Sequence, residues 1–201
     1  MKTPNLKKLY TYYQMMKFEK LIGTGEHLLK RYPENQHLLN ILGLAYDQHA
    51  VNLSELSKRE RYQKKAISYF NTLLKIDPES PKALRGLGLV ALHQNKLTSA
   101  LTYYKKAYAL DKKDISNFSS LGNVYRRMRN YTQALFWYKK CLAMKRLRGM
   151  AYFNIASLYK DQNRSALAKQ YARLGLKSLE KYDDTYPLIM KKKLLLILEE
   201  K

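Results

Sequence analysis

Side chains suited to catalysis or metal binding are few in this sequence: four histidines and a single cysteine. His27, His37, His49 and His93 have no cysteine or acidic partner at metal-ligand spacing, and the sequence contains no HExxH, CxxC or phosphate-loop motif. One cysteine, Cys141, also excludes an internal disulfide. We therefore predict no catalytic residues, no metal and no cofactor.

Recognition of anions is the chemistry that the composition favours. The 201 residues carry 38 Lys+Arg against 16 Asp+Glu, a net charge of +22, which attracts nucleic acid, anionic lipid and acidic proteins. The densest arginine group is Arg126, Arg127 and Arg129, and it spans more than one face of a helix end. Most of the basic residues are lysines scattered along the chain, so the charge is equally compatible with a compositional origin.

A spacing of 34 residues indicates which elements position these side chains. Leu87-Gly88 recurs as Leu121-Gly122 and as Ile155-Ala156, and a period of this size is typical of stacked helix pairs. Small residues eight and twenty places into each unit allow two antiparallel helices to approach closely. The sequence therefore predicts an all-α solenoid, with left-handed residues at Asn95, Asn130 and Asn163 in the turns between helices.

We predict a single solenoid domain over residues 1–201. Its expected parts are a degenerate helix pair at 2–35, a repeat at 36–80, three regular repeats at 81–114, 115–148 and 149–182, and a capping helix at 183–201 whose N-cap is supplied by Asp183-Asp184-Thr185. The step from Leu42 to Leu87 is 45 residues, which indicates an 11-residue insertion near 50–61. We expect the insertion to lengthen two helices and their loop beyond the edge of the stack, where it forms a second candidate surface.

These positions resemble the tetratricopeptide repeat family, whose units carry Leu-Gly at places seven and eight, Tyr at eleven, Ala at twenty, an aromatic residue at twenty-four and Pro at thirty-two. The resemblance covers residues 36–180 well and 2–35 weakly, and it departs from the pattern at Ala91, Ala172 and Gly175. It implies a right-handed superhelix in which the first helix of each repeat lines a concave groove. Tyr104, Tyr138 and most other tyrosines then fall at core places.

The resemblance also implies which residues line the groove. The predicted groove residues are Lys82, Arg85, Leu89, His93, Ser119, Asn123, Arg126, Arg127, Asn154, Ser157 and Lys160. In peptide-binding members, asparagines at the places of Asn123 and Asn154 hold the ligand main chain, because an amide both donates and accepts. Asp47 and Asp161 also fall on groove places, and the basic residues outnumber the acidic ones.

We therefore expect a cytoplasmic, non-enzymatic adaptor that binds an extended or acidic segment of a partner protein. The alternative is a protein that binds nucleic acid or an anionic surface through its basic charge. Homo-oligomerisation through apolar residues at Leu194 to Leu198 is a third possibility. No apolar run reaches the roughly 18 residues that span a bilayer, and the N-terminus does not resemble a signal peptide.

Overall fold

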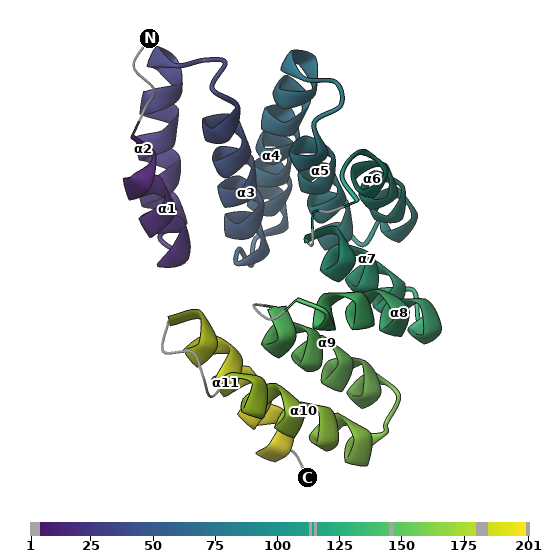
Figure 1. Ribbon diagram of the computed structural model, residues 1–201. Helices are drawn as coiled ribbons and strands as arrows, with labels where there is room; N and C mark the ends of the chain where they lie inside the picture. The colour runs from purple at the N-terminus through teal and green to yellow at the C-terminus, as the bar shows by residue number, and fades with distance from the viewer. Residues whose placement is uncertain (1–4, 113, 115, 145–146, 180–184, 200–201) are drawn as a thin grey trace. The chain divides into compact units, whose positions relative to one another are not determined.

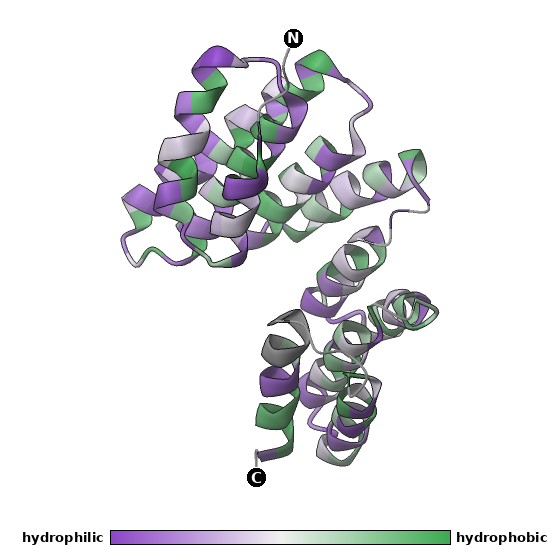
Figure 2. Ribbon diagram, turned by 60° about the vertical axis from the view of Figure 1, so that its left-hand side comes forward, coloured by the Kyte–Doolittle hydropathy of each residue, from purple (hydrophilic) through white to green (hydrophobic). Residues whose placement is uncertain are grey.

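The computed structural model describes residues 5–112, 114, 116–144, 147–179 and 185–199. These residues form eleven α-helices and no strand, as predicted for an all-α solenoid. Contacts divide the chain into two compact units, residues 1–111 and 112–201; each is built from antiparallel helix pairs, and the second ends with one additional helix (Figure 1). Each unit mixes hydrophobic and hydrophilic residues along its helices (Figure 2), as amphipathic packing requires. The boundaries predicted for a single domain stay a prediction.

The first unit contains three helix pairs. Its helices are α1 (Lys7–Gln14), α2 (Phe18–Arg31), α3 (Gln36–Val51), α4 (Leu56–Ile76), α5 (Pro81–His93) and α6 (Leu97–Leu110). The partners of each pair pack together, α2 packs on α3, and α5 packs on both α3 and α4. The core at one end groups Leu9, Leu21 and Leu42, whereas Phe70 and Leu87 lie in the next cluster.

Glycines allow an aromatic ring of the second helix to lie against the first helix of a pair. The ring of Phe70 occupies the space that a Cβ would need at both Gly43 and Gly86, Tyr104 does so at Gly88, and Tyr138 at Gly122. These contacts confirm the packing reason for small residues at place eight. A large side chain at Gly88 should cost about 1–3 kcal/mol through overpacking.

The turns inside four of the helix pairs share one conformation. The first helix ends and a residue with a left-handed φ of 55–60° follows, at Met16, Asn95, Arg129 and Asn163. The next amide then donates to the carbonyl five residues earlier, as from Lys96 to Ala91 at 2.8 Å, which is the hydrogen-bond pattern of a Schellman motif. The helix pair is thus closed by main-chain atoms.

Asn95 and Asn163 have the predicted left-handed conformation, but the prediction for Asn130 is wrong. Arg129 is the left-handed residue of that turn, 34 residues after Asn95. Asn130 is instead the N-cap of α8 (Tyr131–Leu142), where its side chain accepts a hydrogen bond from the amide of Gln133 at 3.2 Å. Asparagine suits both roles, so its identity alone did not separate them.

The pair α3–α4 is longer than the regular pair α5–α6. Helix α3 has 16 residues against 13 in α5, and α4 has 21 against 14 in α6. The loop at 52–55 is one residue longer than the turn at 94–96. The eleven extra residues therefore lie mostly in the first seven residues of α4, 56–62, which we call the α4 extension.

The second unit contains α7 (Ser116–Arg127), α8, α9 (Arg148–Asp161), α10 (Ser165–Leu179) and α11 (Thr185–Glu199). Helix α11 packs on α9 and α10, and its Met190, Leu194 and Ile197 are buried there. Leu195 and Leu196 are exposed, so only part of the apolar run at 194–198 faces outward. The predicted N-cap at Asp183-Asp184 and the repeat start at Ile115 lie outside the described residues.

Candidate functional site

In the second unit, α7 and α9 present several predicted groove residues on one shared face. The amide Nδ2 of Asn154 donates to Oγ of Ser119 at 3.3 Å, and Nε of Arg126 lies 3.6 Å from Oδ2 of Asp161. Each contact joins residues 35 apart, which is one repeat plus one residue. The first helices of consecutive repeats are therefore linked side by side by polar groups, and we call this surface the α7–α9 face.

A buried tyrosine fixes the orientation of Asn123 on the α7–α9 face. The hydroxyl of Tyr138 donates to Oδ1 of Asn123 at 2.7 Å, and the Tyr138 ring is fully buried. Burial is the largest cause that raises the pKa of Tyr138 well above its usual value, while Arg126 acts in the opposite direction. The phenol therefore stays a neutral donor at physiological pH.

Each asparagine keeps one unused hydrogen-bonding atom. Nδ2 of Asn123 and Oδ1 of Asn154 have no hydrogen-bond partner within the described part of the chain. One is a donor and the other is an acceptor, which are the two functions that a peptide main chain complements. Asn154 is 9% exposed, so its acceptor lies at the base of the face rather than on an outer edge.

Basic residues outnumber acidic ones on this face. Arg126, Arg127 and Lys160 stand against Asp161 alone, which gives a net charge of +2. Asp161 lies beside Arg126, and Arg127 and Lys160 are exposed at the ends of their helices. Ser157 is half-buried on α9. The arrangement favours an anionic group at the end of the face where α7 and α9 terminate.

The four remaining predicted residues lie on α5, in the first unit. Lys82, Arg85, Leu89 and His93 are spaced three, four and four residues apart and so follow one stripe of the helix. Lys82 is exposed, and the other three are half-buried. Four of the eleven predicted residues thus belong to the first unit and seven to the second.

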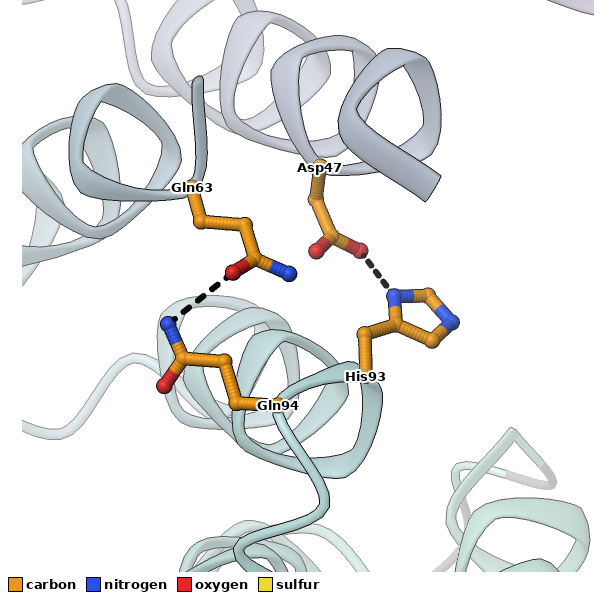
Figure 3. Close-up of polar contacts among 4 residues, drawn as sticks. All are labelled: Asp47, Gln63, His93 and Gln94. Carbon is orange, nitrogen blue, oxygen red and sulfur yellow. Dashed lines mark hydrogen bonds and ion pairs between the residues drawn. The ribbon is translucent and has the colours of Figure 1, made fainter. Parts of the chain in front are cut away.

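His93 forms a close contact with a buried carboxylate. Its Nδ1 lies 2.8 Å from Oδ2 of Asp47 on α3 (Figure 3). A carboxylate only accepts hydrogen bonds, so with Asp47 ionised the proton of His93 resides on Nδ1. Oδ1 of Asp47 is buried and has no hydrogen-bond partner among the described residues.

The placement of Asp47 corrects the sequence-based expectation that it lines an open groove. Its side chain is 0% exposed. On one side it faces α5 through His93, and on another it is close enough to Tyr13 of α1 to contribute, after burial, to the raised pKa of that phenol. Neighbouring helices therefore enclose a position that repeat numbering alone places on the surface.

Sequence models of the tetratricopeptide repeat match residues 59–115, 118–149 and 151–178. Together these matches cover more than half of the chain. The chain belongs to the tetratricopeptide repeat family. Members of this family are generally non-enzymatic scaffolds for protein–protein interaction.

Solved structures share the fold of this chain at low sequence identity. A thermophilic TPR protein from Thermus thermophilus, TTC0263, is 18% identical, with a TM-score of 0.77 and 96% of both chains covered. PilW, a type IV pilus biogenesis factor, is 18% identical with a TM-score of 0.69, over 96% of this chain and 83% of that one. MamA is 22% identical with a TM-score of 0.61, over 90% and 98%. Comparison with curated protein sequences returns no match.

Three further observations on this tetratricopeptide repeat protein concern membrane crossing, metal binding and its cysteine. Among the described residues, no helix has the length and apolar character needed to cross a membrane. The same residues contain no group of three or more histidine, cysteine, aspartate or glutamate side chains that is placed to hold a metal ion. Cys141 is buried, and burial raises the pKa of its thiol to about 11, so it is a poor nucleophile at neutral pH.

Sequence reasoning missed a pocket between the tetratricopeptide repeats of the first unit. It measures about 410 Å³ and lies between the N-terminal part of α4 and the turn that joins α5 to α6. Gln63, only 4% exposed, accepts a hydrogen bond from Nε2 of Gln94 at 3.3 Å across this boundary (Figure 3). The available signal was the spacing of Gln63, Ala66 and Phe70, which places a glutamine on the buried stripe of α4.

Proposed function

We propose that this protein is a non-catalytic adaptor whose α7–α9 face binds an extended, acidic segment of a partner protein. The observation that carries the proposal is the complementary pair of unused atoms, Nδ2 of Asn123 and Oδ1 of Asn154. Hydrogen bonds to Tyr138 and Ser119 already fix the orientation of these two amides, so little side-chain entropy is lost when a peptide main chain binds.

The charge of the face supports an acidic ligand. Arg126 and Arg127 end α7 and Lys160 lies near the end of α9, where cations also interact favourably with the helix dipoles. A carboxylate of the ligand would meet these side chains while its main chain contacts the asparagines. Lys82, Arg85, Leu89 and His93 form a corresponding surface on α5, and we propose that it serves the same partner or a second segment of it.

Binding of short synthetic peptides tests the proposal. Acidic peptides and the same sequences with Gln and Asn in place of Glu and Asp are titrated into the full chain. We expect preference for the acidic set and, for Asn123→Ala with Asn154→Ala, an affinity loss of about tenfold, since two hydrogen bonds worth roughly 1 kcal/mol each are removed in part. Asn52→Ala with Asn71→Ala, two exposed positions on other surfaces, is the matched control.

Equal binding of acidic and neutral peptides, or equal losses in both double variants, would refute the proposal. Arg126→Glu with Arg127→Glu provides a second variant that does not disturb the buried Asn154, and it should abolish acidic-peptide binding. Binding to single-stranded RNA that falls log-linearly and steeply between about 50 and 200 mM salt, together with weak peptide binding, would instead favour the nucleic-acid alternative.

A further inference from the structure

The α4 extension creates one wall of the pocket in the first unit. The pocket of about 410 Å³ is lined by Leu56, Arg59, Glu60, Gln63, Lys64, His93, Gln94 and Lys96. Leu56, Arg59 and Glu60 belong to the seven residues by which α4 exceeds a regular second helix. Without the extension this wall would be missing, so the pocket is a feature of this repeat and not of the regular ones.

The pocket is positively charged. Arg59, Lys64 and Lys96 line it together with one acid, Glu60, which gives a net charge of +2 with His93 neutral. Lys64 and Lys96 form no ion pair within the part of the chain that the structure describes. Two ammonium groups are therefore available to an anion from opposite walls, one from α4 and one from the turn before α6.

Other contacts make the basic walls rigid. Nε and Nη2 of Arg59 donate to the carbonyl of Leu53 at 3.2 and 2.6 Å, which ties the α4 extension to its own loop. At the base of the pocket, Gln63 and Gln94 join α4 to the end of α5. His93, held by Asp47 through Nδ1, anchors the same end of α5 to α3.

A helix N-terminus adds to the attraction for anions. Lys96 is the N-cap of α6, and no side chain makes a capping hydrogen bond there. The first-turn amides of α6 thus lack a side-chain acceptor, and the positive end of the helix dipole lies beside the ammonium group of Lys96. The lining includes Lys96 but none of the first-turn residues Leu97, Thr98 and Ser99, so the helix contributes a background positive field and the lysines carry the argument.

We propose that this pocket binds a carboxylate side chain of an acidic peptide segment, held between Lys64 and Lys96. A peptide fits the lining better than a nucleic acid does. Glu60 can accept a hydrogen bond from a peptide N–H, which a phosphodiester backbone does not offer, and exposed Leu56 offers contact to an apolar side chain next to the carboxylate. The site lies in the first unit and is separate from the α7–α9 face.

Side-chain amide resonances in NMR spectra of the full chain test this site directly. The probe is a synthetic peptide of alternating Glu and Leu with both ends blocked, and the comparison ligands are its Gln-for-Glu analogue and a short oligouridylate. We expect the Glu peptide to shift the amides of Gln63 and Gln94, and the Gln analogue to leave them in place. Asn123 and Asn154 provide a separate reading of the α7–α9 face, so failure of one site is distinguished from failure of the other.

Charge-reversal variants measure the contribution of the lysines. Lys64→Glu with Lys96→Glu should weaken the peptide affinity reported by Gln63 and Gln94 at least tenfold. Lys105→Glu with Lys106→Glu changes the net charge equally at exposed positions of α6 outside the pocket lining, and should change that affinity less than twofold. Equal losses in both variants, peptide-induced shifts confined to Asn123 and Asn154, or larger shifts of Gln63 and Gln94 with oligouridylate would overturn the proposal.

Discussion

The two units use the same repeat places for an acid–base pair but assign the charges in opposite order. In the first unit an acid at place twelve, Asp47, contacts a base at place thirteen of the next repeat, His93. In the second unit the base Arg126 is at place twelve and the acid Asp161 is at place thirteen. The pairs differ in burial: Asp47 is 0% exposed and 2.8 Å from its partner, whereas Asp161 is 44% exposed and 3.6 Å away.

Repeat position thus determines which residues contact each other, whereas the surrounding helices determine how much that contact contributes to stability. A buried, ionised carboxylate must be compensated by its partner, because its desolvation costs several kcal/mol per ion. A solvent-exposed ion pair contributes little to stability, and salt screens the attraction between its charges. We therefore expect the first pair to serve stability and the second to remain available for ligand binding.

The largest expected effect comes from removing the base of the buried pair. His93→Ala leaves Asp47 buried without a partner, so the free energy of unfolding should fall by about 3 kcal/mol, measured by urea denaturation followed by circular dichroism. His37→Ala, at an exposed histidine of α3, is the control and should change stability by less than about 0.5 kcal/mol. A loss for His93→Ala no greater than that of the control would contradict the proposed role of burial.

An intermediate effect is expected when both members of the buried pair become apolar. Asp47→Leu with His93→Leu removes the desolvation cost together with the attraction, so it should recover about 2 kcal/mol of the loss caused by His93→Leu alone. The double-mutant cycle is measured by the same denaturation experiment. Additive losses would show that the two side chains act independently.

The smallest effect belongs to the exposed pair. Arg126→Ala or Asp161→Ala should lower the free energy of unfolding by at most about 1 kcal/mol, and this difference should shrink further in high salt. Arg173→Ala, an exposed arginine on α10, provides the matched control. A loss of stability as large as that of His93→Ala would contradict the idea that burial accounts for the difference between the two acid–base pairs.

Much of the fold was predictable because packing repeats with the sequence. The 34-residue period identified the small residues at Gly88 and Gly122 and the aromatic residues that lie on them, because close helix packing requires a small residue at the same place of each repeat. The role of Asn130 was not predictable from its type, because a one-residue shift separates a left-handed turn residue from a helix cap.

The candidate sites were predictable only in part. The polar stripe on α7 and α9 follows from repeat places. The environment of Asp47 instead depends on helices from distant parts of the sequence: His93 of α5 contacts it, and Tyr13 of α1 lies near enough for the carboxylate to affect its pKa. The pocket depends on how eleven extra residues divide between α3, α4 and their loop. A sequence shows that residues have been inserted, but it does not show this division.

The four matching left-handed turns have a consequence for engineering the length of the protein. Their closing hydrogen bonds come from the main chain, and the side chain at the left-handed place is Met, Asn, Arg or Asn without change of backbone. Residues 129–162 therefore form a cassette whose two ends are the same turn. A second copy of that cassette joined after Gln162 lengthens the chain by one whole repeat and requires no new connection to be designed.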